Sequence, residues 1–312
     1  MDELNDPARA ARRHVLKMMS ALAAGAALSP LTTLAASNTM PANGGGRTIL
    51  VTGSTSGVGR RAAELLAGPG TTLLVHGRNR ERAEEVLATI RNAGGNGRFY
   101  QADFSSLAEV RGLADALSRD CPRLDVLINN AGIGNGRSGD GRQVSADGNE
   151  LRFAVNYLAP FLLTRRLLPL LRASRPARIV NVASSGQNRI DFDNVMLTRG
   201  YDAQRAYGQS KLALIMFTFD LAQELAGSGV TANCLHPATY MDTAMVRESG
   251  ITPWSTVGEG ADAILHLAVA ADVVERTGRY YDGLQPGRPN AQANDRAARE
   301  RLRTLSMKLV GL

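Results

Sequence analysis

The chain has 312 residues, enough for one large α/β domain or two small ones. Hydrophobic residues make up 44% and charged residues 21% of it, a globular balance that excludes a disordered chain. The formal net charge of +7 is spread along the chain without a Lys/Arg run interleaved with aromatic residues, so we expect no nucleic-acid partner. The two cysteines, Cys121 and Cys234, lack the spacing of a disulfide framework or a zinc site, and we expect no metal.

The N-terminal residues resemble a twin-arginine export signal. Arg12 and Arg13 precede an Ala/Leu-rich stretch that Gly and Pro interrupt, so it is too broken for a stable membrane span, and small residues near position 36 offer a cleavage site. We therefore expect export to the periplasm, with a cytoplasmic protein carrying an unrelated N-terminal extension as the alternative. The predicted segments are a signal peptide at 1–37, a linker at 38–46 and one domain at 47–312.

From Arg47 onward, short apolar runs alternate with helical periods, which is typical of parallel βαβ units. The helical segment Arg80 to Asn92, for example, has an apolar face opposite its charged one. The candidate strands are Thr48 to Thr52, Thr71 to His76, Arg98 to Ala102, Leu124 to Asn129, Arg178 to Ala183, Val230 to Leu235 and Gly278 to Tyr281. The pattern predicts a single α/β domain, a Rossmann-type doubly wound parallel sheet of about seven strands with helices on both faces. Such sheets bind ligands at the carboxyl ends of their strands.

Three glycines follow the first predicted strand and open a helix. Glycine there permits a tight turn, lets backbone N–H groups approach a pyrophosphate, and allows the helix to pack closely on the strand. The helix N-terminus adds partial positive charge toward a phosphate. A purely structural turn would look similar, but the position after the first strand favours a dinucleotide site. The predicted cofactor-binding residues of this turn are Gly53, Ser54, Ser56, Gly57, Val58 and Gly59.

The end of the second predicted strand indicates which dinucleotide binds. A site specific for NAD carries an acidic residue there, which accepts hydrogen bonds from the ribose hydroxyls. Here residues 76–79 contain no carboxylate, and Arg78 could bind a 2′-phosphate bidentately. Arg60, directly after the third glycine, could add a second positive contact. We therefore favour NADP over NAD, with two solvated surface arginines as the alternative.

Tyr207 and Lys211 lie four residues apart in a predicted helix, so their side chains share one face. A free phenol has a pKa of about 10, and a neighbouring cation favours the phenolate and lowers that pKa. We therefore predict that Tyr207 is the general acid or base for a substrate hydroxyl or carbonyl, with Lys211 beside it.

Together these features resemble the short-chain dehydrogenase/reductase family. The glycine spacing, the Tyr/Lys pair and the segment 129–132, which reads Asn-Asn-Ala-Gly, are motifs of that family. Residues 206–213 and the ending at 278–283 are most similar to its retinol-dehydrogenase-like branch. The resemblance spans roughly residues 47–312. It implies an oxidoreductase that transfers a hydride between NADP(H) and an alcohol or carbonyl substrate, which in that branch is lipophilic.

The resemblance implies further site residues by position. Ser184, with Ser185 as the alternative, would hydrogen-bond the substrate oxygen. Asn156 would link the catalytic lysine to solvent through water. The positions that match the family's adenine contact and cofactor cleft are Asp103, Asn130, Ala131 and Gly132.

The sequence departs from the family after its sixth predicted strand. The family usually has Pro-Gly there, with a threonine for the nicotinamide amide five residues after the proline. This chain has Ala238 in place of the glycine, and its Thr243 comes one residue late. Either a local bulge shifts Thr243 into place, or Thr239 substitutes for it.

Two further expectations follow from the resemblance. Met241, Met245 and Trp254 would suit a lipophilic substrate, with ordinary packing as the alternative. The family often pairs subunits through the helices that carry Asn156 and Tyr207, so a homodimer is a candidate assembly. The alternative function is a non-catalytic NADP-binding sensor or scaffold on the same fold; the intact serine, tyrosine and lysine argue against it.

Overall fold

The computed structural model describes residues 46–137 and 139–312, so the predicted signal peptide and nearly all of the predicted linker lie outside the described residues. In the described part, eight strands form one sheet in the order β3-β2-β1-β4-β5-β6-β7-β8. Every neighbouring pair is parallel except β7 and β8, which run antiparallel. The strands are β1 (Arg47–Val51), β2 (Thr71–Gly77), β3 (Asn96–Gln101), β4 (Val126–Asn129), β5 (Ala177–Val182), β6 (Val230–His236), β7 (Tyr280–Asp282) and β8 (Gln285–Pro286).

Helices connect the parallel strands and cover the sheet. They are α2 (Gly57–Leu66), α3 (Arg80–Asn92), α4 (Leu107–Asp120), α5 (Leu151–Phe153), the π-helix η1 (Ala154–Leu158), α6 (Ala159–Ala173), α7 (Ala203–Glu224), α8 (Ala244–Glu248), α9 (Val257–Val269), the 3₁₀-helix η2 (Ala291–Asn294) and α10 (Arg296–Val310). No helix within residues 46–137 and 139–312 is long and apolar enough to cross a bilayer.

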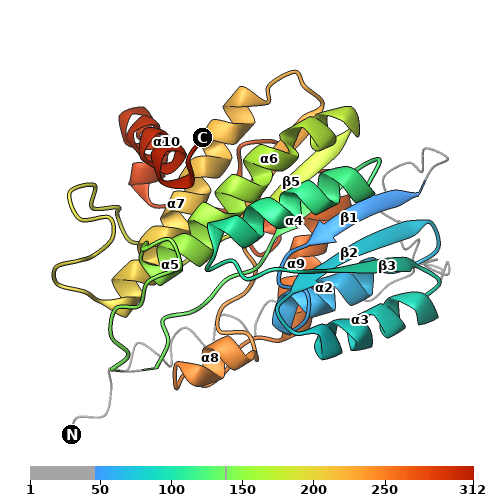
Figure 1. The fold of residues 1–312 in the computed structure, drawn as a ribbon, viewed down its shortest axis with the longest axis horizontal. Helices are drawn as coiled ribbons and strands as arrows, with labels where there is room; N and C mark the ends of the chain where they lie inside the picture. The colour runs from blue at the N-terminus through green and yellow to red at the C-terminus, as the bar shows by residue number, and fades with distance from the viewer. Residues whose placement is uncertain (1–45, 138) are drawn as a thin grey trace, which may run out of the picture. The chain divides into compact units, whose positions relative to one another are not determined.

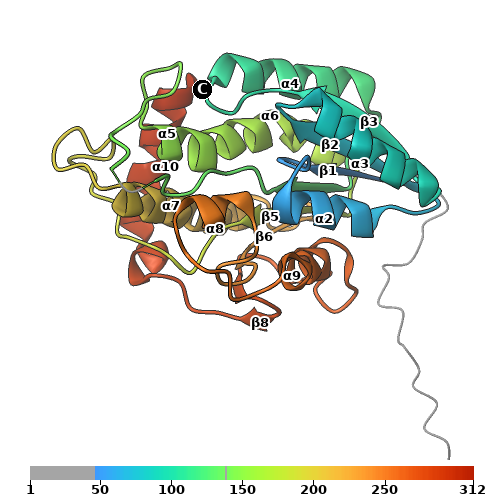
Figure 2. The same cartoon turned by 90° about the horizontal axis from the view of Figure 1, so that it is seen from below.

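The two faces of the sheet bury separate hydrophobic clusters, because side chains alternate along each strand. In β1, Leu50 packs in the cluster that α4, α6 and α7 cover. Ile49 and Val51 pack in the other cluster, with α2, α3 and α9. The ribbon shows these two helical layers on opposite sides of the strands (Figures 1 and 2).

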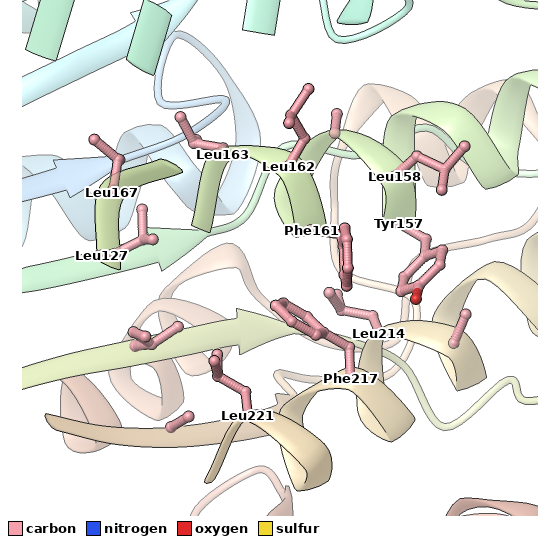
Figure 3. Packing of buried hydrophobic residues seen from close by; sticks show 14 of the residues in the cluster. Leu127, Tyr157, Leu158, Phe161, Leu162, Leu163, Leu167, Leu214, Phe217 and Leu221 are labelled. Atoms are coloured by element: carbon pink, nitrogen blue, oxygen red, sulfur yellow. The ribbon is translucent and has the colours of Figure 1, made fainter. Parts of the chain in front are cut away.

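Aromatic side chains join α6 to α7 on the first of these faces. Phe161 of α6 and Phe217 of α7 have ring centroids 4.8 Å apart, and Tyr157 of η1 lies 5.9 Å from Phe161. These rings point toward one another between the helices (Figure 3). Their burial fixes the position of α7, which carries the predicted catalytic tyrosine, relative to the sheet.

The predicted Rossmann-type sheet in a single domain is confirmed, with one strand more than expected. The additional strand, β8, has only two residues, both exposed, and the second is Pro286. Two residues are too few to show an alternating pattern, so the sequence could not indicate this strand. The order of strands reverses between β1 and β4, and sheets of this kind bind ligands in a crevice at the carboxyl ends of such strands.

Candidate active site

Four predicted catalytic residues converge at the carboxyl edge of the sheet. Lys211 of α7 is buried, and its Nζ donates a hydrogen bond of 2.9 Å to the carbonyl of Val182, the last residue of β5. A side chain built on Gly132, after β4, would meet Asn156 Oδ1 at 3.1 Å and Lys211 Nζ at 3.5 Å. Asn156 and Lys211 therefore flank the same point of the crevice.

Ser184 follows β5 and lies beside Tyr207. A side chain built on Gly186 would lie 3.5 Å from Ser184 Oγ and 3.8 Å from Tyr207 Cε1, and the Ser184 hydroxyl interacts with the phenol. Ser184 Oγ accepts the N–H of Gly186 at 3.1 Å, which leaves its own O–H free to donate to a substrate oxygen. Ser185, the alternative, is exposed and lies 3.3 Å from Nε2 of His236 instead.

Asn156 lies in the π-helix η1, an irregularity that is frequent at functional sites. Its Oδ1 accepts the N–H of Ile133 at 2.8 Å, and its Nδ2 donates to the carbonyl of Ile133 and to Ser210 Oγ, both at 3.0 Å. The Asn156 side chain thus links the segment after β4 to α7 by hydrogen bonds. These contacts show how Asn156 orders the crevice; a water link to Lys211 stays a prediction.

Burial decides the ionisation of the site. It raises the pKa of the Tyr207 phenol, against an opposing contribution from the Ser184 hydroxyl. It lowers the pKa of Lys211 to about 8. The Lys211 ammonium lies 5.7 Å from the centroid of the Tyr207 ring, and it does not overcome the desolvation of the phenol. The expectation that the lysine lowers the phenol pKa is therefore not met, and Tyr207 is protonated at neutral pH.

The glycine turn after β1 closes against the segment after β4. Gly53 and Gly57 adopt left-handed φ angles of 65° and 55°, which favour glycine. A side chain on Gly53 would meet the Cα of Ala131 at 2.8 Å, and Gly59 lies against Asn130, whose Nδ2 donates to the carbonyl of Thr52 at 2.9 Å. Gly53 and Gly59, after β1, are thereby in contact with Ala131 and Asn130, after β4. All four are predicted cofactor residues.

The N-terminus of α2 is open toward an anion. Ser54 is buried and bonds the carbonyl of Val51, so it supports the turn from beneath, whereas Ser56 is the N-cap residue and makes no side-chain cap. Helices α3, α4, α7, α9 and α10 each begin with a capping side chain. The backbone N–H groups at this helix N-terminus have no side-chain cap, and the first turn contains no acidic residue. Together with the small residues of the turn, these features fit a bound pyrophosphate. Val58 packs on the α9 side of the turn, near Gly260.

The two arginines predicted to bind the 2′-phosphate differ in how closely carboxylates already hold their guanidinium groups. Arg78 is 72% exposed at the end of β2, with a long ion pair of 3.6 Å to Asp103. Arg60 is held by Glu64 at 2.8 Å and by Glu85 at 2.7 Å. Arg78 and Asp103 thus lie together where β2 and β3 end, while Arg60 would have to leave two carboxylates to reach a phosphate.

Comparison with known proteins identifies the family. The family model for short chain dehydrogenases matches residues 47–253. Human retinol dehydrogenase 13 is 37% identical to the chain over 289 residues, which cover 86% of this chain and 85% of that protein. The chain belongs to the short-chain dehydrogenase family.

Solved structures with bound NADP have the same fold. The NADP complex of RhlG from Pseudomonas aeruginosa is 30% identical, with a TM-score of 0.63 over 76% of this chain and 94% of that one. The landomycin C-6 ketoreductase LanV, with bound NADP and rabelomycin, is 28% identical, with a TM-score of 0.61 over 77% of this chain and 95% of that one.

The departure from the short-chain dehydrogenase pattern after β6 is absorbed by a tight bend. Tyr240 adopts a left-handed φ of 47°, and the N–H of Thr243 bonds the carbonyl of Met241 at 2.7 Å. Thr243 then caps α8, and a side chain on Gly57 would lie 3.5 Å from its methyl group. Thr239 instead lies 3.0 Å from a histidine of β6. Of the two candidate threonines, Thr243 is the one beside the glycine turn.

The loop that carries these residues also presents apolar side chains to solvent. The rings of Tyr240 and Trp254 meet edge to face at 5.3 Å, and Trp254 is 76% exposed. Met245 is exposed as well and lies against Gly134, which follows the cofactor segment after β4. Met241, in contrast, packs against α9 at Gly260. Met245 and Trp254 are thus available to a ligand, whereas Met241 is a packing residue.

The sequence interpretation missed one residue that supports the site. His76, at the end of β2, is buried, and its Nδ1 accepts the N–H of Gly53 at 3.1 Å. Its Nε2 lies 3.2 Å from the carbonyl of Ala102, which places the ring proton there, and the ring stacks on Phe104 at 4.4 Å. Burial lowers the pKa of His76 to about 4. A lone histidine at a strand end has no spacing that would reveal this role.

Proposed function

We propose that the chain is an NADP(H)-dependent reductase or dehydrogenase that acts on a lipophilic alcohol/carbonyl pair, with Tyr207 as its general acid/base. The observation that carries this proposal is the phenol of Tyr207 beside the Ser184 hydroxyl, at the strand edge that also holds the glycine turn. Proton donor, oxygen-binding group and dinucleotide site then share one crevice.

The residues divide the reaction among them. NADP(H), when bound, would supply or accept the hydride. The Ser184 hydroxyl holds the substrate oxygen by donating a hydrogen bond, and the Tyr207 phenol gives that oxygen a proton. The ammonium of Lys211 stabilises the negative charge that develops on the phenol oxygen. Because desolvation keeps Tyr207 protonated at neutral pH, the phenol is in the form that donates a proton during reduction of a carbonyl.

NADP is favoured over NAD by the end of β2. Arg78 is largely exposed, its only described ion pair is long, and no carboxylate follows β2 itself. A guanidinium there can bind a 2′-phosphate bidentately. The complexes of RhlG and LanV, which contain NADP, support the same preference.

The apolar side chains of the loop after β6 support a lipophilic substrate. Tyr240, Met245 and Trp254 are exposed, and Met245 lies against Gly134, which follows the segment after β4. Burying them against a substrate would remove apolar surface from water. Human retinol dehydrogenase 13 is named for such an alcohol. For the location we keep export to the periplasm by the twin-arginine route, which rests on Arg12 and Arg13, the Ala/Leu-rich stretch after them and the small residues near position 36.

The test is NADPH and NADH oxidation by the full chain across a panel of lipophilic aldehydes and ketones. Tyr207→Phe is expected to lose about 100-fold to 10,000-fold in kcat, because the proton donor is gone while the ring remains. Arg78→Ala is expected to raise KM for NADPH about tenfold and to leave KM for NADH unchanged. Arg61→Ala, an exposed arginine on α2, is the matched control.

Two outcomes would redirect the assignment. If the parent and Tyr207→Phe both fail to turn over but bind NADP, the sensor or scaffold function replaces the reductase. If the parent uses NADH as well as NADPH, and Arg78→Ala changes neither KM, the cofactor preference is wrong while the reaction stands.

A further inference from the structure

The C-terminal segment, residues 290–294, lies against the loop that follows Ser184. The side chain of Gln292, in η2, is 6% exposed and faces the backbone of Ile190. Its Oε1 accepts the Ile190 N–H at 2.7 Å, and its Nε2 donates to the Ile190 carbonyl at 3.2 Å. One side chain thus satisfies both backbone groups of a residue that lies 102 positions away in the sequence.

A second bridge reaches Ser184 itself. Gln187 Nε2 donates to the carbonyl of Ser184 at 2.9 Å, while Gln187 Oε1 accepts the N–H of Asn290 at 2.7 Å. The Tyr280 hydroxyl donates to the same Ser184 carbonyl at 3.2 Å. The backbone of Ser184 is therefore joined to Asn290 through the Gln187 side chain and to β7 through Tyr280.

These side-chain bridges take the place of the backbone hydrogen bonds that a strand or helix would provide. The ladder of β5 ends with the Ala183 N–H, which donates to the Leu235 carbonyl at 2.8 Å, and residues 184–190 belong to no strand or helix. Buried backbone groups need partners, and here Gln187 and Gln292 provide them. The Ser184 Oγ takes its position from this segment, since it accepts the N–H of Gly186. Movement of the segment would shift the hydroxyl relative to Tyr207.

We propose that Gln187 and Gln292 are positioning residues, which hold Ser184 in reach of a substrate oxygen that Tyr207 protonates. This inference rests on the proposed function of the site. A displacement of the oxygen-binding group by about 1 Å is enough to cost roughly 100-fold in rate. The C-terminal segment is then part of the active-site scaffold, although it lies far from the catalytic motif in sequence.

The experiment compares full chains that carry Gln187→Leu, Gln292→Leu or, as control, Gln223→Leu at the exposed end of α7. Both test variants are expected to lose about 10-fold to 100-fold in kcat with the carbonyl substrate. KM for NADPH is expected to stay constant, because the glycine turn is untouched. Hydrogen exchange of the Ile190 amide is expected to be at least about tenfold faster in Gln292→Leu, because its acceptor is lost.

Each result decides a separate point. A folded Gln187→Leu with the kcat of the parent overturns the inference, and so does a variant in which kcat and NADPH binding fall together, since that marks a general structural role. If Gln292→Leu does not fold, Gln187→Leu decides, because its side chain is only partly buried. If the parent reduces no carbonyl, the proposed function fails, and unchanged exchange at Ile190 in a folded Gln292→Leu would overturn the positioning as well.

Discussion

At the scale of single residues, Lys211 combines a stability cost with the catalytic role proposed for it. Its ammonium is buried with one hydrogen-bond partner, and burial lowers its pKa from 10.5 to about 8. Below pH 8 the folded protein carries this cation at a cost on the order of 3 kcal/mol, and the cost disappears as the pH rises from 8 toward 10.5. The stability of the fold therefore does not explain why a charge lies there.

We predict that Lys211→Met abolishes reductase activity and raises the free energy of unfolding by about 1–2 kcal/mol at pH 7. The gain is smaller than the full desolvation cost, because the Val182 carbonyl loses a donor. Denaturant unfolding of parent and variant at pH 7 and pH 10 measures this, with the difference shrinking at pH 10. Lys308→Met, exposed on α10, serves as control. Equal or lower stability of Lys211→Met at pH 7 would contradict the account.

The sequence predicted which residues meet, but not their charge state. Spacing places Tyr207 and Lys211 on one helix face, and the match to a family motif places Ser184 next to them. The direction of the Tyr207 pKa depends on how deeply the phenol is buried, which involves segments distant in sequence. The pairing of Arg60 with Glu85 of α3 is likewise invisible along the chain, because it needs two helices to lie side by side.

At the scale of elements, the glycine turn depends on a histidine that must stay neutral. His76 accepts the Gly53 N–H through Nδ1, which a proton on that nitrogen would prevent. Its pKa is lowered from 6.5 to about 4, so the unfolded chain binds the proton first as the pH falls. Between pH 6.5 and pH 4 the folded protein should therefore lose on the order of 3 kcal/mol from this group alone.

We predict that His76→Gln flattens this acid dependence. A glutamine can accept from Gly53 and donate to the carbonyl of Ala102, but it does not titrate. Urea unfolding at pH 7, 5.5 and 4.5 should show the parent losing stability more steeply than the variant, with the two within about 1 kcal/mol at pH 7. Parallel curves for the two proteins would exclude His76 as the titrating group.

Elements with a long, regular pattern were predictable, and short irregular ones were not. The helix α3 has the bounds expected from the sequence, Arg80–Asn92, because its apolar residues recur at helical spacing and Asn79 caps its start. The π-helix η1 follows from no pattern, since it differs from an α-helix only in where the hydrogen bonds close. The sequence showed that Thr243 comes one residue late and needs a local bulge, but it did not indicate that the bend falls at Tyr240.

At the scale of the whole described chain, α10 covers the groove between α6 and α7. The Tyr157 hydroxyl and Ser306 Oγ lie 2.6 Å apart, and Arg299 bonds Asp220 at 2.8 Å. The space left where the three helices meet is a cavity of ≈ 10 Å³, no more than one water can fill. Residues 208–218 of α7 are buried throughout, so this helix is covered on all sides within one chain.

A second subunit could pair through the helices of Asn156 and Tyr207, as the family resemblance implies, only by displacing α10. We therefore predict that the full chain is a monomer by light scattering at micromolar concentration. Leu302→Asp, which puts a charge into the covered groove, should release α10 and expose Phe161 and Phe217, so that the mass rises with concentration toward two chains. Thr304→Asp, on the outer face of α10, should change nothing. A parent that is already a dimer, or a folded Leu302→Asp that stays monomeric, would mean that α10 does not control self-association.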